Sequence, residues 1–60
     1  MSELLTIPEV AERLRCGRRT AERLIASGEV RSVKIGRRRL VAEDALTQYI
    51  RVAERRARVA

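Results

Sequence analysis

The sequence predicts a small, mostly helical α+β fold in which two short helices, a two-stranded hairpin and a third helix follow one another. Three observations support this prediction. Apolar residues recur at helical spacing in three segments. A stretch rich in β-branched residues lies between the second and third of these segments and has apolar side chains at alternate positions. Capping residues or glycines stand at the boundaries. A chain of 60 residues has room for one small core, so we expect residues 1–60 to form a single domain.

The first helix is expected to begin after Thr6. Thr6 and Glu9 have the spacing of a capping box, in which each side chain bonds the backbone N–H of the other residue. Pro8 suits the first turn, where a missing N–H leaves no bond unmade. The apolar face of this helix repeats at i, i+3, i+4 and i+7 and consists of Ile7, Val10, Ala11 and Leu14. We expect the helix to end near Arg15, because a Cys-Gly pair follows.

A second helix is expected between Gly17, as its N-cap, and Ser27-Gly28, where the glycine would adopt the left-handed conformation. Its apolar face consists of Ala21, Leu24 and Ile25. Two short helices joined by about three residues have the spacing of a helix-turn-helix, whose second helix enters the major groove of DNA.

A hairpin and a third helix complete the prediction. Val33 and Ile35 fall on one face of a strand, Gly36-Arg37 is a candidate turn, and residues 38–41 form the returning strand, so the hairpin spans about 30–41. The third helix spans about 42–57, with acidic residues in its favourable first turn. Its apolar face consists of Ala45, Leu46, Tyr49, Ile50 and Ala53.

The positive charge is concentrated in the middle of the chain. The whole sequence has a formal net charge of +6, whereas residues 13–39 hold ten basic side chains against two acidic ones, a net charge of +8. Such a basic stretch is typical of proteins that bind polyanions. Tyr49 is the single aromatic residue, which argues against a base-stacking surface for single-stranded nucleic acid.

Composition also argues against several other classes. The chain has one cysteine and no histidine, so it lacks an internal disulfide, a zinc cluster and the usual general base of an enzyme. We therefore expect a non-enzyme without metal, cofactor or small-molecule substrate, in a reducing, cytoplasmic setting. Cys16 is expected to pack at the turn as a small apolar side chain. No apolar run approaches the length of a membrane span, so no membrane association is expected.

Several short motifs together give a more specific signal. They are Leu4-Leu5-Thr6, Glu9-Val10-Ala11-Glu12-Arg13-Leu14, Arg18-Arg19-Thr20, Arg23-Leu24-Ile25, Ser27-Gly28-Glu29-Val30, Lys34-Ile35-Gly36-Arg37-Arg38-Arg39 and Glu43-Asp44-Ala45-Leu46. In this combination, residues 4–50 resemble the excisionase branch of the MerR-like winged helix-turn-helix domains. Two positions depart from the family pattern: Arg15 stands where the turn commonly has glycine, and Glu22 stands where an aromatic residue is usual.

The resemblance implies that the chain binds double-stranded DNA, with the second helix in the major groove and the hairpin as a wing against the neighbouring minor groove or backbone. Phage excisionases of this kind bend DNA beside an attachment site and direct an integrase toward excision. Integrase and neighbouring copies of the same chain are thus the expected protein partners. A small MerR-like transcription regulator is the alternative, and a protein-interaction module such as an antitoxin is a third hypothesis.

Nine residues are the candidate DNA contacts. On the second helix they are Arg18, Arg19, Thr20, Glu22 and Arg23, and on the wing they are Lys34, Arg37, Arg38 and Arg39. The helix arginines suit guanine edges or phosphates, but the same pattern would also fit a solvated helix face. Glu22 would accept a hydrogen bond from cytosine, or pair with Arg18 or Arg19 and orient it.

Two basic segments, the wing arginines and the tail, each have two possible roles. The wing arginines fit a narrow minor groove, or else protect the edge of the hairpin by charge; alternation predicts that at least one of the three points away from DNA. The basic tail, residues 51–60, would dock on a recombinase or a neighbouring copy, or form a solvated helix end.

Overall fold

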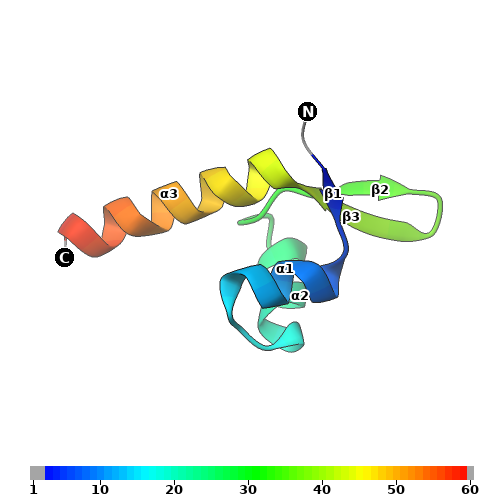
Figure 1. Cartoon of the computed structure of the whole chain (residues 1–60), viewed down its shortest axis with the longest axis horizontal. Coiled ribbons are helices and arrows are strands. Elements are labelled where there is room, and N and C mark those ends of the chain that lie inside the picture. Colours follow the sequence, from blue (N-terminus) through cyan, green and yellow to red (C-terminus); the bar gives the residue numbers. More distant parts are fainter. Residues whose placement is uncertain (1–2, 60) are drawn as a thin grey trace.

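The computed structural model describes residues 3–59 and shows two helices beneath a small sheet, with a hairpin and a long helix projecting in opposite directions (Figure 1). The elements in chain order are β1 (Leu4–Leu5), α1 (Ile7–Leu14), α2 (Arg18–Ala26), β2 (Val33–Ile35), β3 (Arg38–Ala42) and α3 (Glu43–Val59). The expected order of helix, turn, helix, hairpin and helix is confirmed, and the third helix begins at Glu43, one residue later than expected.

Helix α1 begins with the expected capping box. The backbone N–H and the hydroxyl of Thr6 both donate to the Glu9 carboxylate, over 2.9 and 3.0 Å, and the Thr6 hydroxyl oxygen accepts from the Glu9 backbone N–H over 3.4 Å. Two backbone donors at the helix start are thereby satisfied. The box fixes where the chain leaves β1 and enters α1.

The turn between α1 and α2 depends on Arg15, which has the left-handed conformation with φ 54° and ψ 43°. Its N–H donates to the Glu12 carbonyl over 3.1 Å, and the N–H of Cys16 donates to the Ala11 carbonyl over 3.0 Å. These two bonds form a Schellman motif, which normally places glycine at the position of Arg15. The half-buried Cys16 packs against the core, as expected. Arg15 therefore adopts the left-handed conformation that glycine commonly provides in this turn.

Helix α2 ends where the sequence predicts. Gly28 has φ +84°, and its N–H donates to the Ile25 carbonyl over 3.2 Å. Two residues later, the N–H of Val30 donates to the Leu24 carbonyl, also over 3.2 Å. This bond folds the chain back over the helix, and the Val30 side chain is consequently fully buried.

The sheet contains a strand that the sequence did not reveal. A two-stranded hairpin was expected, but the described residues form a three-stranded antiparallel sheet in the order β1-β3-β2. Leu4 pairs with Ala42 and Leu5 with Val41, and the Glu43 N–H donates to the Glu3 carbonyl over 2.8 Å. A strand of two residues is too short to show alternation, so only its pairing with β3 identifies it.

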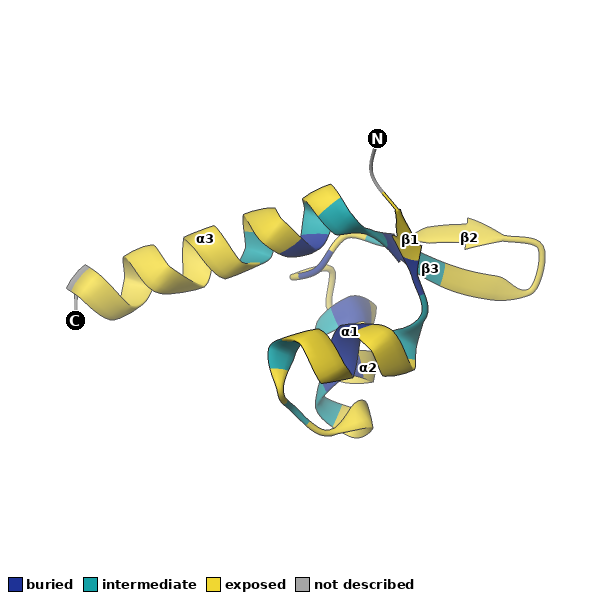
Figure 2. Ribbon diagram, in the orientation of Figure 1, coloured by how far each residue is buried: buried dark blue, intermediate teal, exposed yellow. Residues whose placement is uncertain are grey.

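The core is small and lies where α1, α2, β3 and the start of α3 meet (Figure 2). Its buried side chains are Leu5, Val10, Ala11, Ala21, Ile25, Val30, Val41 and Leu46. Tyr49 packs at the edge of this cluster, as expected. Most of α3 and the whole hairpin tip are exposed. Among the described residues, no helix is long and apolar enough to span a bilayer.

The left-handed Arg15 makes one prediction about stability. Arg15→Gly should raise the free energy of unfolding by about 0.5–1 kcal/mol, because glycine adopts this conformation without the clash that a Cβ introduces. For a domain of this size that corresponds to a rise in Tm of about 2–8 °C, measurable by circular dichroism. Arg15→Ala removes the same charge but keeps the Cβ, so it should not be stabilising. Equal Tm values for the two variants would contradict this explanation.

The capping box makes a second prediction, on pH. Hydrogen bonds from the Thr6 backbone and hydroxyl lower the pKa of Glu9 below its ordinary value of 4.5. A lowered folded-state pKa contributes stability that is present above the unfolded pKa and is lost as the pH falls through the folded value. The Tm advantage of the native chain over Glu9→Gln should therefore be full at pH 7 and shrink as the pH falls below 4.5. A difference in Tm that stays constant with pH would contradict this account.

Candidate nucleic-acid interface

Helix α2 presents a basic face to solvent. Ala21 and Ile25 are buried against α1 and the rest of the core, which fixes how the helix is rotated. Arg19 and Arg23 lie on the opposite side, one turn apart, and both are exposed. Arg18 is also exposed, at the first helical position. Within the described chain these three guanidinium groups form no hydrogen bond or ion pair, so their donors are available to a ligand.

The other two residues predicted on this helix differ in position. Thr20 is half-buried at the edge of the basic face, whereas Glu22 is exposed beside Arg19 and Arg23. The expected ion pair between Glu22 and Arg18 or Arg19 is absent from residues 3–59. All three side chains are exposed, and exposed pairs at helical spacing contribute little to stability. The Glu22 carboxylate is therefore left as a hydrogen-bond acceptor on the same surface.

The start of α2 adds backbone donors to the basic side chains. Gly17 is the N-cap and makes no side-chain capping bond. The first N–H groups of the helix are thus not satisfied by a cap, and the helix dipole gives this end a partial positive charge. Arg18 and Arg19 follow directly. This end of α2 consequently favours an anion such as phosphate.

The hairpin forms the second basic projection, which we call the wing (residues 33–42). Gly36 has φ +63° and occupies the first central position of the two-residue turn, as a type II′ turn requires. Arg37 is the other turn residue. The pair Ile35–Arg38 closes the hairpin. The wing projects away from α3 (Figure 1), and its outer half is exposed (Figure 2).

The register decides which wing side chains share a face. Lys34 pairs with Arg39, and both lie on the face that carries the buried Val41 further along β3. Arg38 lies on the opposite face, together with Val33 and Ile35. These two apolar residues share one face, as the alternation predicts, but they are 45% and 52% exposed and do not belong to the core.

Arg39 differs from the other two wing arginines because it has a partner. Its Nη1 donates to the Ser32 hydroxyl oxygen over 3.0 Å, at the base of the wing. Arg37 and Arg38 form no such bond within residues 3–59. The three consecutive arginines thus divide into one turned back toward the base and two at the tip. The sequence predicted that at least one of the three points away from DNA, without identifying which one; that remains a prediction.

One ion pair connects the helices at the other side of the domain. Arg13 Nη1 lies 3.4 Å from a Glu43 carboxylate oxygen, which joins the end of α1 to the start of α3. Both side chains are about half exposed, so the pair contributes at most about 1 kcal/mol. Among the basic groups of residues 13–39, Arg13 and Arg39 are thus the two that have a side-chain partner in the described part of the chain. The sequence gave no signal for the Arg13–Glu43 pair, because the two residues are 30 positions apart.

The arrangement defines a class of protein. Two helices joined by a tight turn, with the second exposing an arginine-rich face, and a basic hairpin beside them, form a winged helix-turn-helix. None of these side chains is placed as a nucleophile or a general base within a cavity. The exposed arginine forks and N–H groups are instead suited to hold phosphates and base edges.

Comparison with known proteins gives the family. Residues 4–51 match the family model described as a helix-turn-helix domain. A protein named "Probable excisionase" from Saccharopolyspora erythraea is 46% identical over 46 residues, 77% of this chain and 47% of that protein. A protein named "Excisionase" from Streptomyces ambofaciens is 44% identical over 48 residues, 80% of this chain and 77% of that protein. No solved structure matches.

The chain belongs to the helix-turn-helix domain family, since the match covers α1, α2, the wing and the first half of α3. It spans about half the length of the relative from S. erythraea and about three quarters of the relative from S. ambofaciens.

Proposed function

We propose that this chain is a non-enzymatic, sequence-specific binder of double-stranded DNA that acts as an excisionase. The observation that carries the proposal is the combination of two relatives named as excisionases, at 46% and 44% identity, with an α2 whose three arginines are exposed and unpaired within the described chain. A single domain of this kind supplies one helix and one wing to the DNA. It would act on DNA in the cytoplasm of a bacterial cell.

In this proposal α2 enters the major groove. Arg19 and Arg23 are one turn apart on the exposed face and are our candidates for base edges, where arginine forks bind guanine. Arg18 and the free N–H groups of the first turn would hold a phosphate at the groove edge. Thr20, half-buried at the side of this face, would contact the backbone, and Glu22 would accept from a cytosine amino group.

The wing would bind the adjacent minor groove. Arg37 and Arg38 stand at the tip with no partner in the described chain, and a narrow minor groove attracts such arginines. Lys34 and Arg39 share the other face and are our candidates for phosphate contacts along the flank. Two groove contacts on neighbouring stretches of DNA favour a bent duplex.

The proposal includes two protein partners. An excisionase changes whether an integrase excises or integrates DNA, so an integrase that acts at the same attachment site is the expected partner. Neighbouring copies of this chain would occupy repeated sites beside each other. Both are expected from the function and not from a contact in the structure.

A binding experiment tests the assignment of the helix residues. Arg19→Ala or Arg23→Ala should weaken binding to a duplex selected in vitro by about 1–3 kcal/mol and should have a smaller effect on random DNA. Arg58→Ala removes the same charge near the far end of α3 and is the matched control. For the native chain, log affinity should fall with log salt concentration at a slope near −5 if about six phosphates are contacted. Equal losses for all three variants, or a flat salt response, would contradict the proposed interface.

A recombination assay tests the biological part of the proposal. Attachment-site DNA, the integrase of the same mobile element and this chain are combined, and excision and integration products are counted separately. The chain should increase excision, and Arg23→Ala should reduce that effect in proportion to its lost DNA affinity. Unchanged excision together with intact DNA binding would instead identify a transcription regulator.

A further inference from the structure

Ile35 is an apolar side chain left uncovered at the tip of the wing. Among the described residues it is the most exposed of the large apolar side chains, at 52%. It directly precedes the turn at residues 36–37, far from the core, which meets the wing only at its base (Figure 2). Val33, on the same face, is 45% exposed but has an apolar partner, Leu40, directly opposite. The residue directly opposite Ile35 is Arg38.

The strand itself does not require isoleucine at position 35. Threonine has the same β-branched shape and is also enriched in strands, and it would not present an apolar side chain to water. Burying the exposed half of an isoleucine side chain in a complex raises the affinity of that complex by about tenfold. The position therefore favours an apolar contact with something outside the chain.

The charges around Ile35 identify what can cover it. Residues 33–42 contain no acidic side chain and four basic ones: Lys34, Arg37, Arg38 and Arg39. Arg37 follows Ile35 in the turn, and Arg38 faces it across the strand pair, where opposite Cβ atoms lie about 4.5–5.5 Å apart. A partner that covers Ile35 must therefore accept two guanidinium groups in the same contact. This requires a polyanion with an apolar interior.

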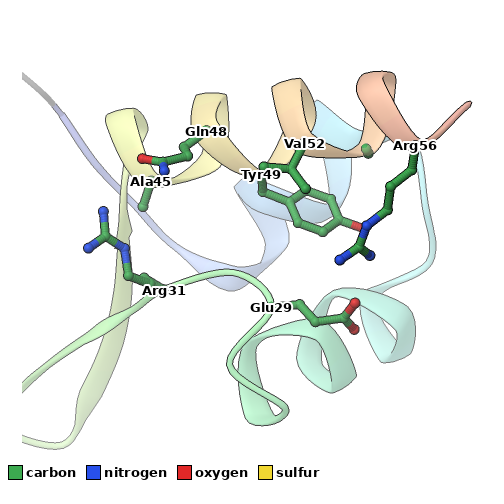
Figure 3. A pocket seen from close by; sticks show the side chains of 8 residues that line it. Glu29, Arg31, Ala45, Gln48, Tyr49, Val52 and Arg56 are labelled. Atoms are coloured by element: carbon green, nitrogen blue, oxygen red, sulfur yellow. The ribbon is translucent and has the colours of Figure 1, made fainter. Parts of the chain in front are cut away.

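The exposed apolar part of α3 does not select a partner in this way. It has two grooves, of about 390 and 400 Å³, and Tyr49 and Ala53 line both and form a ridge between them. Charges of both signs line the grooves: Glu29, Arg31 and Arg56 in the first (Figure 3), and Arg13 and Glu54 in the second. The wing tip differs because its charge has a single sign.

The minor groove of double-stranded DNA combines phosphates along its edges with sugars and base edges inside. The groove is about 6 Å wide, whereas the two strands of a hairpin lie about 4.8 Å apart before their atoms are given any thickness. The wing tip can therefore enter only where the groove opens. Apolar side chains inserted at a base step open it, because they partly unstack the bases and kink the duplex by about 20–90° toward the major groove.

Ile35 stands at the depth that such an insertion needs. It is one residue behind the turn, or about 3.3 Å, whereas Val33 is three residues behind it, or about 10 Å. With the turn at the floor of a groove about 7.5 Å deep, Ile35 lies inside the groove and Val33 outside it. Arg37 and Arg38 would hold the tip there by their charge.

We propose that Ile35 is a wedge that enters the minor groove with the wing tip, partly unstacks one base step and bends the duplex at that step. The inference rests on the proposed DNA binding by α2 and the wing, and it assigns the bend to one side chain. It also gives the wing a part in sequence preference. Pyrimidine–purine steps such as TA and CA unstack most easily, so the step beneath the wing should be one of these.

Two fluorescence measurements on the native chain test the wedge. The probe is a duplex selected in vitro for binding, with a dye at each end and with 2-aminopurine in place of one adenine at a time in the half that the wing covers. Binding should raise the 2-aminopurine fluorescence severalfold at a single step, since unstacking removes its quenching. Energy transfer between the two dyes should increase, since a bend brings the ends closer.

Three variants separate an apolar wedge from a residue that only forms strand. Ile35→Thr should abolish the 2-aminopurine signal, reduce the bend by about half or more and weaken binding about tenfold. Val33→Thr makes the same kind of change on the same face, outside the groove, and should alter affinity less than about twofold. Ile35→Leu stays apolar and should keep both the signal and the bend. Unchanged amide signals of Lys34 and Arg39 in heteronuclear NMR spectra check that each free variant retains the hairpin.

The outcomes distinguish the wedge from DNA binding as such. A native chain that binds the duplex without unstacking or bending it would overturn the inference and leave DNA binding in place. Equal effects of Ile35→Thr and Val33→Thr, or loss of the signal in Ile35→Leu, would also overturn it. So would self-association of the free chain that Ile35→Thr removes, because a second copy would then cover the tip. A chain that binds no duplex would contradict the proposed function and the wedge together.

Discussion

The packing of Val41 at the centre of the sheet is the interaction on which the rest of the structure depends. Val41 is fully buried, pairs with Leu5 of β1 and belongs to the middle strand, to which β2 pairs on the other side. Strand β3 also contacts α1 and leads directly into α3. The helix pair, the wing and the projecting helix are therefore held relative to one another through this strand. A side chain smaller than valine here would leave a cavity common to all of them.

Among the described residues, eight buried side chains form the core, and this small number determines how the surface is used. None of the buried side chains in the described part of the chain is polar or charged, so every arginine remains in solvent or pairs at the surface. The buried apolar side chains fix how α2 is rotated and hold the base of the wing. The basic side chains of α2 and of the wing tip therefore remain exposed. Because the core is this small, it also leaves the outer half of α3 uncovered.

Local patterns allowed much of the fold and the site to be predicted. The capping box at Thr6 and Glu9, the helix end at Gly28 and the turn at Gly36 each depend on neighbouring residues, and each is found where it was expected. The basic residues of α2 were also placed correctly on its exposed face, because helical periodicity fixes which side chains share a face. What the patterns missed joins distant residues: the strand β1, the Arg39–Ser32 bond and the Arg13–Glu43 ion pair.

The sequence by itself determined the order of the elements, the concentration of charge at residues 13–39 and the resemblance to winged helix-turn-helix proteins, since all of these are properties of short segments. Only the tertiary structure decided which wing arginine turns back, how the sheet gains its third strand, and that Tyr49 and Ala53 form a ridge between two grooves. The physical reason is that pairing register and packing bring together residues that are far apart in the chain, and one strand's alternation cannot specify its neighbours.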